Sequence, residues 1–156
     1  MRVATLGIIV RDGRVYLGYK KKGVEEISDI INGPGGKQEP GETLEECLIR
    51  ETFDEMGIRL SADKLVKIAV ITFFAGGVAD FEVHVYWTDY FEGELVETKS
   101  MVPKSYPVDQ LPFDEMLEGD VVWFAKTVRG ETFNAHVYYK ERAKDFERIE
   151  FFPFTP

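Results

Sequence analysis

The sequence has little cysteine, little histidine and a shortage of positive charge. Its single cysteine, Cys47, cannot form an internal disulfide, which is compatible with a reducing compartment and favours a role for Cys47 as a small core residue. The 19 Lys and Arg residues against 28 Asp and Glu residues give a formal net charge of -9. This balance argues against a nucleic acid polymer as a partner, because phosphates attract a basic surface. A small anionic substrate stays open if a metal ion screens its charge.

The sequence also lacks a long hydrophobic run and a signal peptide. No apolar stretch approaches the ~20 residues of a membrane-spanning helix, and the N-terminal residues do not combine a basic head, an apolar stretch and a small-residue cleavage site. We therefore expect no membrane partner and a cytoplasmic protein. The 156 residues are 44% hydrophobic and 30% charged, which is typical of a globular domain with a substantial core. We expect one domain over residues 1–156, as a monomer or a homodimer.

Two hairpins and a further strand are indicated by β-rich runs and the turn residues between them. The expected strands cover residues 3–10 and 14–20, joined at 11–13, then roughly 64–74 and 80–89, joined at 75–78, and finally 132–139. Residues 23–40 are expected to be mostly loop, as is the segment that carries Pro103 and Pro107. The sequence contains no internal repeat and no interdomain linker.

Two helices are predicted, over residues 44–56 and 119–128. The first helix follows a capping box that begins at Thr43. The helix ends at Gly57, a residue suited to the left-handed conformation at a helix C-terminus. The order of strands and helices predicts an α+β fold, arranged as an α/β/α sandwich. In this arrangement two main helices cover opposite sides of a mixed central β-sheet.

The first predicted helix carries acidic residues on its apolar face. At about 100° per residue, Glu51 and Glu55 are one turn apart and project along the apolar stripe of the helix. Burying two like charges together is costly unless a cation or a proton offsets them, so this pattern indicates a metal site. Asp54 flanks the pair and Glu42 precedes the helix, which makes four carboxylates candidates to converge on a hard cation such as Mg²⁺. The alternative is a solvated acidic face, which we prefer for residues 45–46.

Two neighbouring features support the metal hypothesis. Arg50 lies beside the acidic face and is placed to orient Glu42 or another ligand by bidentate hydrogen bonds. Residues 32–37, Asn-Gly-Pro-Gly-Gly-Lys, form a glycine-rich segment whose backbone groups can approach a phosphate or a metal ion closely. The two histidines, His84 and His136, lack metal-ligand spacing and are expected to be packing or strand residues.

The segment from Gly36 to Ile58, GKQEPGETLEECLIRETFDEMGI, resembles the Nudix box. The matching positions, without insertion, are Gly36, Glu42, Arg50, Glu51, Asp54, Glu55, Gly57 and Ile58. Two positions depart from the pattern: Thr52 stands where an apolar residue is usual, and Asp54 stands where the first of two glutamates is usual.

The resemblance implies the Nudix fold and metal-assisted hydrolysis of a pyrophosphate bond in a nucleoside diphosphate-linked substrate, with water attacking phosphorus. It implies that Glu55, Glu51 and Arg50 are catalytic. It also implies a site for Mg²⁺, with Mn²⁺ as the alternative, and the implied ligands are Gly36, Glu51, Asp54 and Glu55. The general base is left open.

Within this family, the chain is similar to the oxidised purine nucleoside triphosphatases of mammals, the MutT-like enzymes that act on 8-oxo-dGTP. The likeness rests on residues 17–21 (LGYKK), 32–37 (NGPGGK), 83–85 (VHV), 109–113 (DQLPF) and 123–124 (WF). It implies hydrolysis of a purine nucleoside triphosphate to the monophosphate and pyrophosphate, with Asn32 and Asp120 recognising the purine edge. The residues implied to line the nucleotide pocket are Thr5, Lys20, Phe74, Phe81, Met101, Trp123 and Tyr139.

Three positions in the implied pocket depart from that subfamily. Leu117 stands in place of a tryptophan that stacks on the base, and Gly119 stands in place of the first of two adjacent aspartates. Ser100 stands in place of a further metal-binding glutamate, for which Glu97 is the nearby substitute. These departures leave open a Nudix enzyme for another nucleotide or a nucleotide-sugar, and a catalytically weakened nucleotide-binding module.

Purely structural explanations also stay open for single residues. The pair Asn32-Gly33 is an ordinary turn sequence, and Asp120 is a candidate cap for the helix that follows it. Lysines 20–22 suit a solvated strand end, and the aromatic pocket residues suit a core. The blandest alternative is a structural domain whose acidic helix is only solvated surface.

Overall fold

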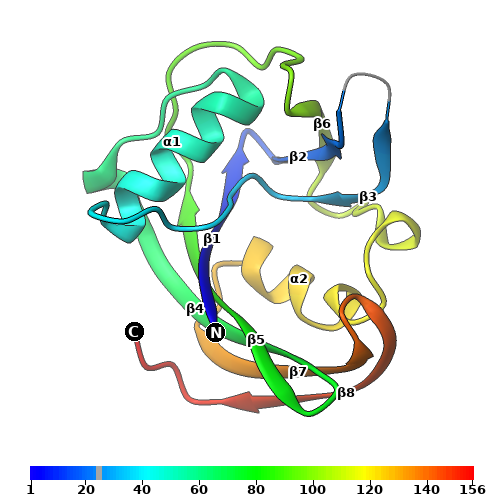
Figure 1. Ribbon diagram of the computed structural model, residues 1–156. Helices are drawn as coiled ribbons and strands as arrows, with labels where there is room; N and C mark the ends of the chain where they lie inside the picture. Colours follow the sequence, from blue (N-terminus) through cyan, green and yellow to red (C-terminus); the bar gives the residue numbers. More distant parts are fainter. Residues whose placement is uncertain (24–25) are drawn as a thin grey trace.

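The computed structural model describes residues 1–23 and 26–156 (Figure 1). The elements in chain order are β1 (Arg2–Arg11), β2 (Arg14–Lys21), β3 (Ile27–Asn32), α1 (Leu44–Met56), the 3₁₀ turn η1 (Ala62–Lys64), β4 (Val66–Ala75), β5 (Val78–Thr88), β6 (Met101–Pro107), the 3₁₀ turn η2 (Phe113–Glu115), α2 (Asp120–Val128), β7 (Phe133–Glu141) and β8 (Lys144–Phe152). No helix within the described ranges combines the length and the apolar character needed to cross a membrane.

The described strands form one mixed sheet in the order β3-β2-β1-β5-β4-β7-β8, with β6 also paired to β2. Strand β1 runs parallel to β5, and β4 runs parallel to β7, whereas the other pairs are antiparallel. The predicted first hairpin is present but short, because β1 and β2 pair only at Val10–Val15 and Arg11–Arg14. Strand β2 pairs with β6 over residues 14–20 and with β3 over residues 18–21, so β2, β3 and β6 form one part of the sheet and the remaining strands another.

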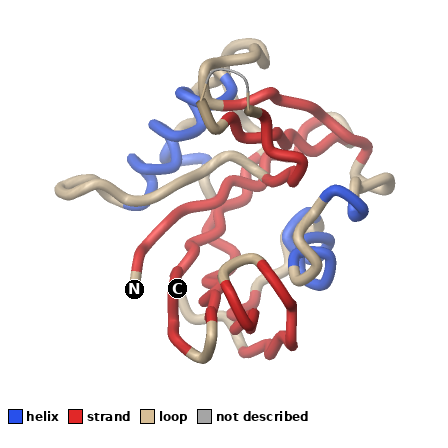
Figure 2. Tube along the Cα trace, turned by 45° about the vertical axis from the view of Figure 1, so that its right-hand side comes forward, coloured by secondary structure: helices blue, strands red, loops and turns tan. Residues whose placement is uncertain are grey.

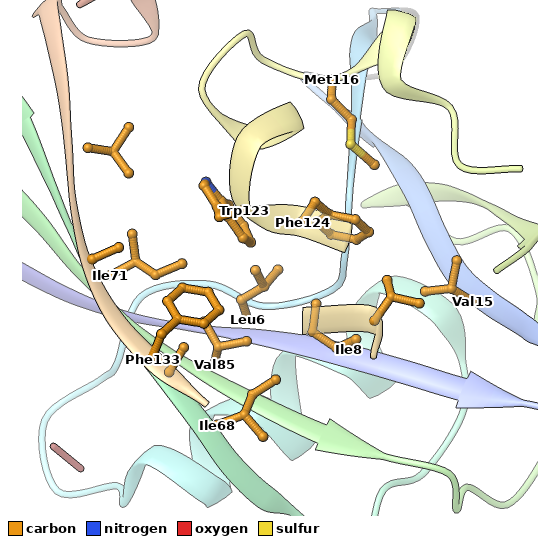
Figure 3. Packing of buried hydrophobic residues seen from close by; sticks show 14 of the residues in the cluster. Leu6, Ile8, Val15, Ile68, Ile71, Val85, Met116, Trp123, Phe124 and Phe133 are labelled. Atoms are coloured by element: carbon orange, nitrogen blue, oxygen red, sulfur yellow. The ribbon is translucent and has the colours of Figure 1, made fainter. Parts of the chain in front are cut away.

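Helices α1 and α2 pack on opposite sides of β1, as Figures 1 and 2 show from two directions. On the α2 side, Trp123 and Phe124 face Leu6, Ile8 and Val85 of the sheet (Figure 3). On the α1 side a second cluster is built from Ile9, Leu48, Met56, Ile58, Leu60, Tyr86, Phe91 and Met101. Since successive side chains of a strand point to opposite faces, β1 serves both cores. The predicted α/β/α arrangement is therefore confirmed.

Helix α1 has the bounds that the sequence predicts. The Thr43 hydroxyl accepts the Glu46 amide at 3.1 Å, and the Glu46 carboxylate accepts the Thr43 amide at 3.1 Å, which completes the capping box. Gly57 ends the helix at a φ of 73°, and its amide donates to the Phe53 carbonyl at 2.9 Å. Both ends of the helix are thus determined by local sequence.

Three strands were not predicted. Residues 27–32 form β3 inside a segment that was predicted to be mostly loop, of which residues 24–25 lie outside the described residues. Residues 101–107 form β6, so the prediction of a loop around Pro103 and Pro107 was wrong. Strand β6 carries Pro103 and Pro107 and pairs with β2 at the side of the sheet, where a missing backbone N–H is tolerated. Strand β8 is mostly exposed and lacks the alternating pattern of a half-buried strand. The second hairpin, the second helix and β7 are confirmed near their predicted bounds.

Candidate active site

A cavity of about 460 Å³ opens beside β1, between the segment that follows β3 and helix α2. Its lining residues are Ala4, Thr5, Leu6, Lys20, Asn32, Gly33, Gly35, Gly36, Lys37, Glu51, Phe73, Phe81, Val83 and Trp123. The acidic helix and the aromatic residues therefore meet at one cavity. Of the residues implied by the family resemblance, the cavity brings together Thr5, Lys20, Asn32, Gly36, Glu51, Phe81 and Trp123.

Glu55 lies in the last turn of α1, next to this cavity. Its side chain is 5% exposed, and its carboxylate accepts the Gly35 amide at 2.9 Å. Its other oxygen lies 3.4 Å from the Lys20 ammonium. Burial raises the pKa of Glu55 and the nearby Glu51 carboxylate adds to this, whereas Lys20 and the Gly35 amide act in the opposite direction. The Glu55 carboxylate is thus buried beside a positively charged group.

The glycine-rich segment is held along β1 by backbone hydrogen bonds. The Thr5 amide donates to the Gly36 carbonyl at 2.9 Å, and the Gly7 amide donates to the Pro34 carbonyl at 2.7 Å. Gly35 has a φ of 149°, and a Cβ there would lie 2.0 Å from the Thr5 carbonyl oxygen. A Cβ on Gly36 would lie 2.6 Å from the Glu51 carboxyl carbon. Both glycines are therefore required by close packing around the carboxylates.

Arg50 orients the carboxylates of two neighbours. Its Nε and Nη2 donate to the two oxygens of Glu42 at 3.0 and 2.7 Å, and its Nη1 donates to Glu51 at 2.7 Å. The bidentate hydrogen bonds from Arg50 lower the pKa of Glu42 to about 2. The orienting role that the sequence predicts for Arg50 matches this geometry.

The oxygen atoms around Lys20 suit a hard cation. The Lys20 ammonium donates to the Gly35 carbonyl at 2.9 Å and pairs with Glu55, so two oxygen ligands already face one positive charge beside the cavity that Glu51 lines. Within the described parts of the chain, no group of three or more His, Cys, Asp or Glu side chains converges as a metal site. The expected convergence of four carboxylates is therefore not met in this arrangement, since Glu42 is tied to Arg50.

Two of the implied metal ligands have different surroundings. Asp54 is exposed on the outer side of α1. The Gly36 carbonyl already accepts the Thr5 amide. Gly35, which the sequence did not single out, presents its carbonyl to Lys20 and its amide to Glu55. The signal for Gly35 was its place in the glycine-rich segment, whose members could not be ranked from sequence.

Two of the implied pocket residues lie elsewhere. Phe74 stacks on Tyr138 with ring centroids 4.6 Å apart, and Phe73 lines the cavity in its place. A register shift between Phe73 and Phe74 accompanies this change of face. Met101 is fully buried in the α1-side core. The prediction that Phe74 and Met101 line the pocket is therefore corrected.

Asp120 and Tyr139 are buried next to the cavity and do not line it. Asp120 is 2% exposed, and its Oδ1 has no hydrogen-bond partner among the described residues. Its side chain makes no capping hydrogen bond to α2, so the capping alternative is wrong. Burial raises the pKa of Asp120 to about 7, and Trp123 acts in the opposite direction. The Gly119 amide donates to the Tyr139 hydroxyl at 2.9 Å.

The raised pKa of Asp120 gives a prediction for stability. An acid whose pKa is higher in the folded state than its ordinary 3.8 destabilises the fold as pH rises from about 4 to 7. We expect Asp120→Asn to match the wild-type Tm near pH 4 and to exceed it by at least about 3 °C at pH 8. Thermal unfolding across this pH range measures the difference, with the exposed Asp109→Asn as control. A difference independent of pH would contradict the raised pKa.

The remaining departures from the subfamily also have defined surroundings. Glu97 accepts a hydrogen bond from Lys21 at 2.8 Å and is mostly exposed, so it does not stand in for the glutamate that Ser100 replaces.

His84 is buried and lies 2.7 Å from a Glu82 oxygen. His136 packs against aromatic rings. The prediction that both histidines are packing residues is consistent with these contacts.

Comparisons with known proteins agree on one family. The NUDIX domain model matches residues 1–130. The chain is 37% identical to an oxidized purine nucleoside triphosphate hydrolase of Danio rerio, over 92% of this chain and 89% of that protein. It is 34% identical to the Mus musculus protein of the same name, over 90% of this chain and 88% of that protein.

Solved structures agree on the fold. The crystal structure of a MutT protein from Bacillus halodurans superposes with a TM-score of 0.78 over 97% of both chains at 19% identity. A MutT NUDIX hydrolase from Burkholderia pseudomallei superposes with a TM-score of 0.60 at 29% identity, over 71% of this chain and 86% of that one. Nudix hydrolases generally use divalent metal cations. With a domain match over most of its length and relatives above 30% identity, the chain belongs to the NUDIX family and is a Nudix hydrolase.

Proposed function

We propose that the protein hydrolyses a purine nucleoside triphosphate to the monophosphate and pyrophosphate, and that oxidised purines such as 8-oxo-dGTP are its substrates. One observation carries this proposal. A single cavity is lined by Glu51, with the buried Glu55 next to it on α1, and by Trp123, with the buried Asp120 next to it on α2. A nucleotide needs both ends, because its phosphates bind cations and its base needs a flat apolar wall with polar groups. The names of the two curated relatives support the same substrate class.

At the phosphate end, Glu51 and Glu55 are the residues that would hold Mg²⁺, with Mn²⁺ as the alternative. When bound, the metal supplies charge neutralisation on phosphate oxygens and on the leaving group. Gly36 and Asp54 are the further ligands that the Nudix pattern suggests. Arg50 holds the Glu51 carboxylate in orientation at 2.7 Å. Lys20 and Lys37 line the cavity and bring positive charge to the triphosphate.

At the base end, Asn32 and Asp120 are the proposed polar contacts. The Asn32 side-chain oxygen accepts the Gly33 amide at 2.8 Å, which leaves the carboxamide NH₂ group as a donor toward the cavity that Asn32 lines. The turn role and the recognition role of Asn32 are therefore compatible. The unpartnered Oδ1 of Asp120 supports a role in hydrogen bonding, because a buried polar atom without a partner is costly. Phe73, Phe81 and Trp123 supply the apolar wall.

A nucleotide panel tests the proposal. We expect kcat/KM for 8-oxo-dGTP to exceed that for dGTP by at least about 10-fold in the presence of Mg²⁺, because a single hydrogen bond to the N7–H or the 8-oxo group, which dGTP lacks, is worth ~1–1.5 kcal/mol. Release of pyrophosphate and of the monophosphate is measured by chromatography, with an ADP-sugar in the panel. Equal rates with 8-oxo-dGTP and dGTP would contradict the preference. Nucleotide binding by calorimetry without release of pyrophosphate would contradict hydrolysis and favour a binding module.

A further inference from the structure

Gly119 is packed so closely against β7 that a side chain there would displace its neighbours. A Cβ at this position would lie 2.6 Å from the Tyr139 hydroxyl oxygen, and 3.1 Å from both Phe146 Cδ1 and Val137 Cγ1. Distances this short require the neighbours to shift. The Tyr139 hydroxyl therefore fills the space in which a side chain of residue 119 would begin.

The Tyr139 hydroxyl is a buried donor. It accepts the Gly119 amide at 2.9 Å, and within the described residues it donates no hydrogen bond of its own. Tyr139 is 4% exposed. Burial, followed by the neighbouring Asp120, raises the pKa of Tyr139 to about 12, so the hydroxyl keeps its proton at neutral pH. Asp120 Oδ1, which also lacks a partner in the described residues, is the other polar group of this wall.

These two groups lie directly behind residues that line the cavity. Asp120 and Trp123 are three residues apart on α2 and therefore share one helix face, and Trp123 lines the cavity. Phe73 also lines the cavity and pairs in β4 with Val137 of β7. Tyr139 is two residues beyond Val137, on the same buried face of the strand. A base that slides along Trp123 and Phe73 would bring its edge to Asp120 and Tyr139.

Building on the proposed function, we infer that the Tyr139 hydroxyl determines specificity by donating to the 6-oxo oxygen of a purine while the Asp120 carboxylate accepts its N1–H. The site then selects 6-oxopurines, of the guanine type, over 6-aminopurines. A 6-aminopurine presents an N–H donor at position 6 and an acceptor at N1. It would need an acceptor at residue 139, where one lone pair already accepts the Gly119 amide. A mismatched pair of buried polar groups costs affinity.

The test compares 6-oxopurines with 6-aminopurines, and of the two pairs dITP and dATP differ only at position 6 and in the N1 proton. For wild type and Tyr139→Phe, kcat/KM is measured with dITP and dATP, and with 8-oxo-dGTP and 8-oxo-dATP. We expect wild type to prefer each 6-oxo base by at least about 10-fold, and Tyr139→Phe to lower that ratio about 10-fold through a loss on the 6-oxo base alone. Tyr138→Phe, which changes a hydroxyl on the other face of β7, serves as the control and is expected to keep the ratio.

Other outcomes overturn the inference. A structural role for Tyr139 would lower Tm and slow both bases equally, so an unchanged ratio rejects the inference even if stability falls. Gly119→Ala displaces the Tyr139 hydroxyl without removing it, and it is also expected to lower the ratio of 6-oxo to 6-amino activity. This second variant keeps the inference testable if Tyr139→Phe folds poorly. Calorimetry with dIMP and dAMP measures the preference for a 6-oxo base as a difference in binding affinity, without hydrolysis. If wild type hydrolyses none of the nucleotides the proposed function fails, whereas equal binding of dIMP and dAMP rejects the role of Tyr139 by itself.

Discussion

Replacement of Glu55 by glutamine is expected to reduce kcat by at least about 10³-fold, at the upper end of the loss caused by removing one group that stabilises developing charge. The carboxylate is buried, accepts the Gly35 amide and lies 3.4 Å from Lys20. Glutamine has nearly the same shape and can still accept the Gly35 amide through its oxygen. It removes the negative charge, and with it the attraction for a cation. The change therefore separates charge from packing at this position.

Three measurements make the Glu55 prediction specific. Circular dichroism and Tm are expected to stay close to wild type, because an amide costs less to bury than a carboxylate. Titration with Mg²⁺ or Mn²⁺ is expected to show weaker binding. Glu45→Gln, on the same helix, keeps an acceptor for the Tyr86 hydroxyl and is expected to keep full activity. Full activity in Glu55→Gln would contradict the role of this carboxylate, and unaltered metal binding would contradict its role as a ligand.

Replacement of Arg50 by alanine is expected to lower metal affinity and kcat by about 10- to 100-fold, the usual cost of losing a residue that orients a ligand. Arg50 donates two hydrogen bonds to Glu42 and one to Glu51. Without the guanidinium, the Glu51 carboxylate is free to rotate away from the cavity, and Glu42 loses its main counter-charge. Arg50→Lys is expected to recover little, because an ammonium cannot form the bidentate pair.

The Arg50 prediction is checked by metal titration and steady-state kinetics on the same preparation. Arg129→Ala removes an exposed arginine that pairs with Glu131 on the surface, and it is expected to leave both quantities unchanged. A fall in Tm with normal metal affinity would show that Arg50 only fastens the loop to the helix, since it also bonds the Lys37 carbonyl at 3.2 Å. That result would reject the orienting role.

Helix α1 and its acidic face were predictable because both depend on near neighbours. The capping box at Thr43 and the glycine at 57 define the ends of the helix through contacts within four residues. The direction of Glu51 and Glu55 follows from the helical repeat, and the structure turns both toward the interior. The bidentate bond between Arg50 and Glu42 spans only eight residues along the chain.

The strands at the sides of the sheet were harder to predict, because their stability comes from distant partners. Strand β6 forms on β2, more than 80 residues earlier, although its sequence contains two prolines. Strand β8 is exposed along most of its length and is held by β7. Neither segment shows the alternation of apolar and polar residues by which a half-buried strand is found in a sequence.

The base end of the cavity also depended on pairings that the sequence does not display. A register shift in β4 accompanies the placement of Phe73, rather than Phe74, at the cavity. Met101 lies in the core on the α1 side of the sheet. A family pattern transfers residue positions, but it does not transfer the face on which a shifted strand presents them. Position-by-position comparison therefore pointed to Phe74 and Met101, whereas Phe73 lines the cavity.

The sequence by itself determined the acidic helix, its two ends and the inward direction of Glu51 and Glu55, because helical geometry repeats over a few residues. Tertiary structure decided what the Glu55 carboxylate meets: Gly35 and Lys20, brought in from a loop and a strand. It also decided that a glycine at 119 lies against the Tyr139 hydroxyl, 20 residues further along. Such contacts depend on how strands and helices pack across the sheet, and packing is a property of the whole chain.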